Sequence, residues 1–209
     1  MIPPDWETLK KQNGKQLPHW DCKKAIYHVC FRLADSIPKG KLQQWFLERE
    51  LIIRSAAFKN GKLTKEEQKR LQYLFSDKIE KFLDVSHGEC HLRRVKAAEI
   101  VKEALQHFDG QRYYLHAWSI MPNHVHTIME PAAGHRLSKI VHTWKSFTAN
   151  RINRQLDRTG PFWQHETYDH IIRSENEYWD QVEYVWRNPE KAGLIKCLRW
   201  RLDKPESLV

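Results

Sequence analysis

The sequence contains no stretch rich in glycine, serine or proline that would link two domains. Its longest apolar runs, such as residues 51–53, are far too short to cross a bilayer, and no basic-then-apolar leader begins the chain. The cysteines form no CxxC pair, which argues against a zinc knuckle and a disulfide framework; they are Cys22, Cys30, Cys90 and Cys197. These absences predict one cytoplasmic domain over residues 1–209, with no membrane as partner.

Acidic residues are in the minority. The chain has 35 Lys+Arg against 26 Asp+Glu, which gives a formal net charge of +9 and a pI near 9.4. A positive excess of this size suits a polyanionic partner such as nucleic acid. Charge alone does not separate DNA from RNA or from another acidic surface.

Hydrophobic periodicity predicts helices interleaved with strands of antiparallel type. Strands are expected at 25–33, 112–120 and 124–130, the last two adjacent and antiparallel, with a short extended piece at 90–92. Helices are expected at 39–54, from Thr64 through a stripe that includes Leu74, Phe75 and Phe82, at about 95–108, at 137–155, and at 175–187. In the 137–155 helix, Phe147 is expected in the buried stripe and Lys145 in solvent. This alternation predicts an α+β fold, an antiparallel sheet with helices packed on it.

The segment Met121-Pro122-Asn123-His124-Val125-His126 places two imidazoles one residue apart directly after a predicted strand. Side chains alternate along a strand, so His124 and His126 project from one face while Val125 turns into the core. Two convergent imidazoles are half of a divalent-metal site. The alternative is a strand that simply exposes polar residues.

The last predicted helix carries an aromatic residue on its polar side. Ser174 and Glu177 form a capping box, and the wheel places Tyr184 roughly opposite Val182 with Asn188 one turn further on. Pro189 disfavours helical geometry at the residue before it, so Asn188 is expected in a frayed last turn. The alternative for Tyr184 is a surface tyrosine on an amphipathic helix.

These motifs together resemble the REP-associated tyrosine transposases, which belong to the HUH nuclease type of single-strand DNA transposases. The resemblance covers roughly residues 90–195 and rests on 121–126, Trp144-Lys145-Ser146-Phe147-Thr148, Phe162-Trp163-Gln164, 168–173 and 182–194, with 27–38 resembling the family's first strand. It implies a ferredoxin-like, HUH-type core in which a His-hydrophobic-His strand faces a helix that bears the nucleophilic tyrosine. By the same resemblance, His124, His126 and Asn188 are metal ligands and Tyr184 is the nucleophile.

The implied activity is that of a metal-dependent endonuclease and strand transferase acting on single-stranded or hairpin DNA, through a 5′-phosphotyrosine intermediate. A divalent ion, Mg²⁺ or Mn²⁺, would activate the phosphodiester, and two imidazole ligands should make Mn²⁺ well tolerated. The chain contains no P-loop, in agreement with strand transfer that needs no ATP. The second hypothesis is a binding protein for DNA hairpins whose nuclease has decayed; the third is a small α+β protein with structural histidines.

Substrate contacts are predicted for Lys145, Arg151, Arg154 and Arg173, which would track phosphates, and for Trp163, which would stack on a base. For each basic residue a solvated surface charge is an equal alternative. Proton transfer or phosphate contact is a weaker hypothesis for His142, His165 and His170. Residues 39–90 are interpreted as a helical insertion that binds DNA, mediates self-association or enlarges the core. The target hairpin, homo-oligomerisation, and whether the chain mobilises DNA or processes repeats stay open.

Overall fold

The computed structural model describes residues 4–13, 18–58, 64–73, 78–194 and 196–203. The chain divides into two compact units, one made of Met1–Ala34 with His91–Val209 and the other of Asp35–Cys90. The single domain expected over 1–209, with its insertion at about 39–90, stays a prediction.

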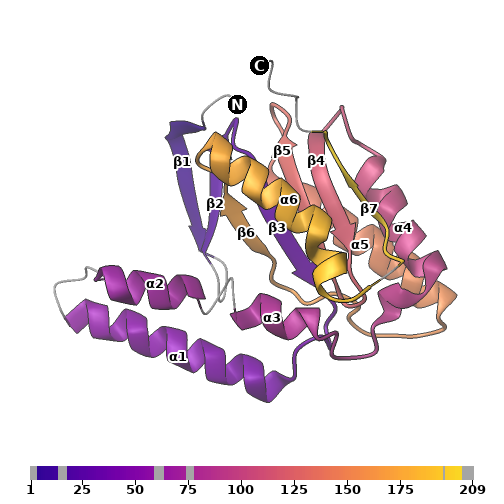
Figure 1. Ribbon diagram of the computed structural model, residues 1–209, viewed down its shortest axis with the longest axis horizontal. Helices are drawn as coiled ribbons and strands as arrows, with labels where there is room; N and C mark the ends of the chain where they lie inside the picture. The colour runs from indigo at the N-terminus through magenta and orange to yellow at the C-terminus, as the bar shows by residue number, and fades with distance from the viewer. Residues whose placement is uncertain (1–3, 14–17, 59–63, 74–77, 195, 204–209) are drawn as a thin grey trace. The chain divides into compact units, whose positions relative to one another are not determined.

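A five-stranded antiparallel sheet forms the centre of the first unit, in the order β6-β3-β5-β4-β7 (Figure 1). Its strands are β3 (Tyr27–Arg32), β4 (Tyr113–Ile120), β5 (His124–Pro131), β6 (Tyr168–Ile171) and β7 (Arg199–Arg201). The predicted neighbours β4 and β5 are paired and antiparallel, with Ser119 opposite His126. On its other side β5 pairs with β3, with Cys30 opposite His126. The strand that carries the histidine pair therefore lies in the middle of the sheet.

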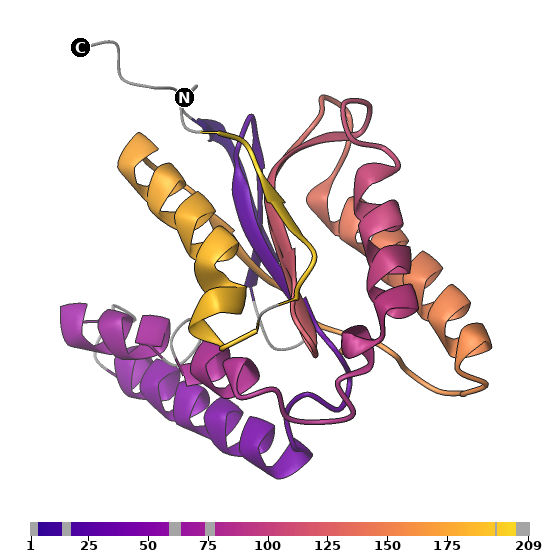
Figure 2. The ribbon, with the colours of Figure 1, turned by 45° about the vertical axis from the view of Figure 1, so that its right-hand side comes forward.

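Helices cover both faces of this sheet (Figure 2). On one face lie α4 (Val95–Gln106) and α5 (Leu137–Gln155), and on the other lies α6 (Glu175–Lys191). The larger core cluster joins α4 and α5 to alternate strand residues such as Val29 and Val125. The smaller cluster joins Val182 and Val185 of α6 to Ile128 of β5. The predicted α+β class, an antiparallel sheet with helices packed on it, is confirmed.

Several short elements differ from the expectations. Neither the edge strands β6 and β7 nor a separate two-stranded sheet of β1 (Asp5–Asn13) and β2 (Pro18–Lys23) was expected. The extended piece expected at 90–92 is instead the 3₁₀ turn η2 (His91–Arg93). Phe147, expected in the core, is 45 % exposed, while Thr148 takes the buried position beside it. The Thr148 hydroxyl is satisfied there, because it donates to the Trp144 carbonyl at 2.6 Å.

The second unit is helical. It contains α1 (Lys39–Phe58), α2 (Lys65–Tyr73) and α3 (Ile79–Asp84). The predicted capping box at Thr64 is present, since the Glu67 N–H donates to the Thr64 hydroxyl at 3.2 Å and the Glu67 carboxylate accepts the Thr64 N–H at 2.8 Å. The single helix expected to run on from Thr64 is wrong, because α2 ends at Tyr73 and Ile79 opens α3; Leu74 and Phe75 lie outside the described residues.

One glycine in this unit is required by a close approach. Gly88 has φ +89°, and a Cβ there would lie 2.8 Å from the Asp35 carbonyl oxygen. The Asp35 carboxylate also accepts the Glu89 N–H at 2.8 Å. A side chain at position 88 would therefore clash with the start of the unit, besides adopting a left-handed backbone. In the parts of the chain that are described, no helix is both long and apolar enough to span a bilayer.

Candidate metal and nucleophile site

The two histidines of β5 lie side by side on the face that α6 covers. Both are fully buried, and their ring centroids are 4.8 Å apart. Val125 between them points to the opposite face and is fully buried in the core with α5. The alternation predicted from the sequence thus orients the pair as expected.

Hydrogen bonds at Nδ1 orient both rings. His124 Nδ1 lies 2.7 Å from the Asn123 side-chain oxygen, and because an amide oxygen only accepts, this Nδ1 carries the proton. His126 Nδ1 lies 2.9 Å from His28 Nε2. Because Nδ1 of each ring is engaged in such a contact, Nε2 of His124 and Nε2 of His126 are the nitrogens placed to coordinate a cation.

α6 brings the tyrosine and the amide over these rings. The Tyr184 ring centroid is 5.7 Å from that of His126 and 5.9 Å from that of His28. Asn188 is fully buried, and its Nδ2 donates to the Tyr184 hydroxyl at 3.1 Å. Tyr184 therefore packs against the histidines and is not a tyrosine on the solvent side of the helix.

The expectation that Asn188 lies in a frayed last turn is wrong. α6 continues through Pro189 to Lys191, and both Asn188 and Pro189 are buried. A proline inside a helix removes one backbone hydrogen bond and crowds the carbonyl one turn before it. The helix nevertheless continues here, with the proline buried and the Ala192 N–H bonded to the Asn188 carbonyl at 3.1 Å. The amide is thus fixed in a regular turn.

Two buried atoms near Tyr184 have no hydrogen-bond partner within the described part of the chain and could serve as ligands of a divalent cation. Among the residues that the structure describes, His126 Nε2 and Asn188 Oδ1 are buried and accept no hydrogen bond. Buried polar atoms without a partner are costly, and these two belong to side chains that both contact Tyr184. Imidazole nitrogens with an amide oxygen form a mixed set that suits Mn²⁺ and its neighbours and tolerates Mg²⁺.

Burial keeps the histidines neutral. It lowers the pKa of His124 to about 3, and burial followed by repulsion from His170 lowers the pKa of His28 to about 4. Burial, followed by the adjacent His124 and His28, also lowers the pKa of His126 well below 6.5. At neutral pH no proton competes with a cation for these rings.

Sequence reasoning missed His28. It is 3 % exposed and lies diagonally across the β3 and β5 pair from His126, whose direct partner is Cys30. The local signal was a histidine inside an apolar strand, on the same side as Cys30 and Arg32. Only the register between β3 and β5 reveals what it touches.

Two of the predicted DNA contacts lie on the other face of the sheet and are engaged inside the protein. Lys145 of α5 donates to the His165 carbonyl at 2.7 Å and to the Thr167 hydroxyl at 3.2 Å. Burial, followed by Arg32, lowers its pKa to about 8. Trp163 is 6 % exposed and donates to Thr148 Oγ1 at 2.9 Å. Lys145 is thus half-buried where solvent exposure was expected.

The other predicted contacts are at the surface. Arg151 and Arg154 are exposed on α5, and Arg151 pairs with Glu103 at 3.2 Å. Arg173 is exposed just before α6. Among the three further histidines, His142 and His165 are exposed and His170 bonds Glu177 at 2.7 Å. The structure does not bring the α5 arginines together with the histidine pair, and the contact roles stay predictions.

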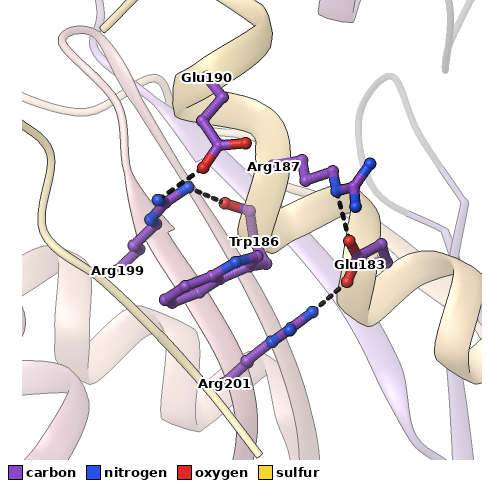
Figure 3. Close-up of polar contacts among 6 residues, drawn as sticks. All are labelled: Glu183, Trp186, Arg187, Glu190, Arg199 and Arg201. Carbon is purple, nitrogen blue, oxygen red and sulfur yellow. Dashed lines mark hydrogen bonds and ion pairs between the residues drawn. The ribbon is translucent and has the colours of Figure 1, made fainter. Parts of the chain in front are cut away.

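The C-terminal strand β7 holds the outer side of α6 (Figure 3). Arg199 donates to the Trp186 carbonyl and to Glu190, each at 2.7 Å, and its guanidinium lies 4.2 Å from the Trp186 ring centroid. Arg201 pairs with Glu183, whose carboxylate also pairs with Arg187 one turn along. Because Glu183 precedes Tyr184, this network positions the helix that bears the tyrosine.

We expect Arg199→Ala to lower the melting temperature by roughly 2–8 °C, because about 1–2 kcal/mol of charge-assisted bonding and stacking is lost. The loss should shrink at 1 M salt, where ion pairs are screened. Arg187→Ala is the matched control, since it removes only a pair within α6 worth about 0.3–0.5 kcal/mol. An unchanged melting temperature for Arg199→Ala at low salt, measured by circular dichroism, would contradict a holding role for β7.

Comparison with known proteins agrees with this geometry. Residues 87–186, just under half of the chain, match the family model "Transposase IS200 like". His124, His126 and Tyr184 lie inside this match, and Asn188 lies two residues beyond it. A Haemophilus influenzae protein that carries the name of a REP-associated tyrosine transposase is 24 % identical over 108 residues, which are 47 % of this chain and 60 % of that protein. The matched part thus spans less than two thirds of that relative.

Two solved structures are similar at low identity. One is a REP-associated tyrosine transposase bound to a REP hairpin, with a TM-score of 0.45 at 13 % identity, covering 85 % of this chain and 73 % of that one. The other is named as a transposase of Deinococcus radiodurans, with a TM-score of 0.36 at 14 % identity, covering 85 % and 97 %. At these scores neither adds to the fold described above. As its motifs predicted, this chain is similar over residues 87–186 to the IS200-like transposases and over 108 residues to a REP-associated tyrosine transposase.

Proposed function

We propose that this protein is a metal-dependent endonuclease and strand transferase for single-stranded, hairpin-forming DNA, with Tyr184 as nucleophile. One observation carries the proposal: Tyr184 contacts both side chains that hold the buried atoms His126 Nε2 and Asn188 Oδ1, which have no hydrogen-bond partner among the described residues. Its ring centroid is 5.7 Å from that of His126, and its hydroxyl is 3.1 Å from Asn188 Nδ2. The relatives support it, since they are named transposases and one of them was solved with a REP hairpin. The net charge of +9 suits a DNA partner.

His124, His126 and Asn188 would hold the cation. When bound, a divalent ion supplies Lewis-acid activation of a non-bridging phosphate oxygen and offsets the charge that develops there. The Tyr184 oxygen attacks phosphorus and forms the phosphotyrosine bond, while the bond from phosphorus to the 3′ oxygen breaks. The tyrosine proton leaves as the attack proceeds, and the departing 3′ oxygen gains one. Asn188 donates to the Tyr184 oxygen and so orients it for the attack.

The covalent phosphotyrosine intermediate allows the reaction to run in reverse. One phosphodiester bond is exchanged for another, so a 3′ hydroxyl of a second strand can attack the phosphotyrosine and release Tyr184. This joins DNA without a nucleotide cofactor. The same residues then serve cleavage and rejoining.

The test is a covalent-adduct assay with the full chain. Labelled single-stranded hairpin DNA is incubated with Mn²⁺, Mg²⁺ or EDTA, and a denaturant-stable protein-DNA adduct is sought and mapped by peptide mass spectrometry. We expect an adduct on the peptide of Tyr184 that depends on the divalent ion. Hairpin binding with no adduct over a varied set of hairpins and both ions would instead indicate a binding protein.

The metal role predicts the effect of His126→Ala. Loss of one imidazole donor should weaken Mn²⁺ binding by about 100-fold, the upper end of what changes around such ligands cost. Free Mn²⁺ measured by electron paramagnetic resonance checks this directly. His116→Ala is the control, because His116 is another histidine facing α6 and bonds Tyr178 Oη at 2.8 Å. Equal Mn²⁺ affinity in the two variants would rule out His126 as a ligand.

The DNA contacts predicted for Arg151 and Arg154 of α5 can be tested by the salt dependence of DNA affinity. If Arg151 and Arg154 each meet a phosphate, replacing either with glutamine should reduce the slope of log affinity against log salt by about 0.7 for a single strand. Lys96→Gln on the neighbouring α4 removes the same charge from an exposed residue and should leave the slope unchanged. Filter-binding titrations from 50 to 300 mM salt measure the slope. Identical slopes in all variants would leave the α5 arginines as solvated surface charges.

A further inference from the structure

His28 forms a buried histidine pair with His126. Its Nε2 lies 2.9 Å from His126 Nδ1, and the two ring centroids are 5.1 Å apart. His28 lies on β3, outside the segment 87–186 that matches the transposase family. Its environment is closed, with 3 % of its surface exposed. Nothing in the chemistry proposed above requires a histidine at this position.

Two neutral imidazoles that share one hydrogen bond have two arrangements. In the first, His126 Nδ1 carries the shared proton and donates it to His28 Nε2, so that His126 Nε2 holds a lone pair. In the second, His28 Nε2 carries the proton, and His126 must hold its own proton on Nε2. Only the first arrangement leaves His126 able to coordinate a cation. Both rings are buried, which favours their neutral forms.

The proposed metal role of His126 decides between the two arrangements. Its Nε2 is buried and has no hydrogen-bond partner among the described residues, and a nitrogen that coordinates a cation must keep its lone pair. A neutral ring carries only one proton, so the proton of His126 is then on Nδ1, and His28 Nε2 accepts it at 2.9 Å.

We propose that His28 is a positioning residue that holds His126 in its Nδ1–H tautomer, so that its Nε2 lone pair faces the cation site. The inference rests on the metal role proposed above. It gives β3 a part in the site beside β5 and α6, because His28 orients a histidine of the neighbouring strand. Outer hydrogen bonds of this kind typically change metal affinity by about 10–100-fold.

The direct test is ¹⁵N nuclear magnetic resonance of the His126 ring in metal-free protein at pH 7. The wild type should carry its ring proton on Nδ1. His28→Phe removes the acceptor and should shift His126 toward the Nε2–H tautomer, and Mn²⁺ affinity should fall about tenfold. His28→Gln keeps an amide oxygen near the position of Nε2 and should restore the affinity to within about threefold of the wild type. His116→Phe should change neither measurement.

His28→Gln guards against loss of folding in His28→Phe, because it keeps a polar side chain at this buried position. A wild-type His126 protonated on Nε2 would overturn the inference, as would a tautomer and a Mn²⁺ affinity that are both unchanged in His28→Phe. These results are distinct from those of the adduct assay. A wild type with the Nδ1–H tautomer and no DNA adduct would contradict the proposed enzyme and leave the positioning role in place.

Discussion

Tyr184→Phe is expected to abolish the protein-DNA adduct, by about 10³-fold or more, with DNA affinity preserved to within about twofold. Removal of a nucleophile eliminates the covalent step, and such changes carry some of the largest costs measured in enzymes. Phenylalanine keeps the ring that packs against His126 and His28. The variant loses only the hydroxyl that accepts the Asn188 amide bond.

The neighbouring tyrosines provide matched controls. Tyr178 lies on the same helix, but its hydroxyl bonds His116 and burial raises its pKa to about 12, which makes it a poor nucleophile. Tyr168 lies edge-on to His28 at 6.4 Å between ring centroids. Tyr178→Phe and Tyr168→Phe should both retain the adduct. An adduct that persists in Tyr184→Phe and disappears in Tyr168→Phe would assign the nucleophile to β6 and refute the role of Tyr184.

Local sequence rules predicted the elements that build the site. The period of two set both histidines of β5 on one face, and that face is the one that α6 covers. The Ser174 cap predicted the start of α6, where the Ser174 hydroxyl accepts the Glu177 N–H at 3.2 Å. The apolar stripe predicted α5 with its observed bounds, Leu137–Gln155. In each case the determining interactions lie within a few residues of each other along the chain.

Long-range contacts account for what the sequence did not predict. β6 and β7 have only four and three residues, too few for a periodic signal, and exist because β3 and β4 offer them an edge. The helical wheel placed Asn188 on the polar side of α6. The residue is nevertheless buried, because the side of the helix next to the apolar stripe faces the histidines. His28 and His126 are far apart along the chain, and their contact depends on strand register. Patterns within one segment of the sequence cannot reveal a contact between residues on two different strands.

Acidification is expected to destabilise the metal-free protein more than ordinary surface histidines would. His28 and His124 have folded-state pKa values of about 4 and about 3, below the unfolded value of about 6.5, and His126 is lowered in the same direction by burial and by its two neighbouring histidines. Between pH 6.5 and 4 the unfolded chain therefore binds more protons than the folded one. Stability is full above pH 6.5 and is lost as the pH falls through this window, by about 1.4 kcal/mol per pH unit for each ring.

From pH 7 to pH 5 His28 and His124 together should lower the free energy of unfolding by roughly 4 kcal/mol, and His126 acts in the same direction; this is a large part of the whole stability of many domains. Urea unfolding in EDTA at the two pH values measures the loss. His28→Gln removes one titrating ring and should reduce the loss by roughly 2 kcal/mol. Because the folded rings are already neutral, Mn²⁺ affinity should stay nearly constant over the same range, whereas ordinary histidine ligands would lose it as they protonate. A steep fall in Mn²⁺ affinity between pH 7 and pH 5, together with an unchanged free energy of unfolding, would contradict this prediction. It would mean that water and protons reach these rings, and that the packing of α6 on β3 and β5 does not close the site.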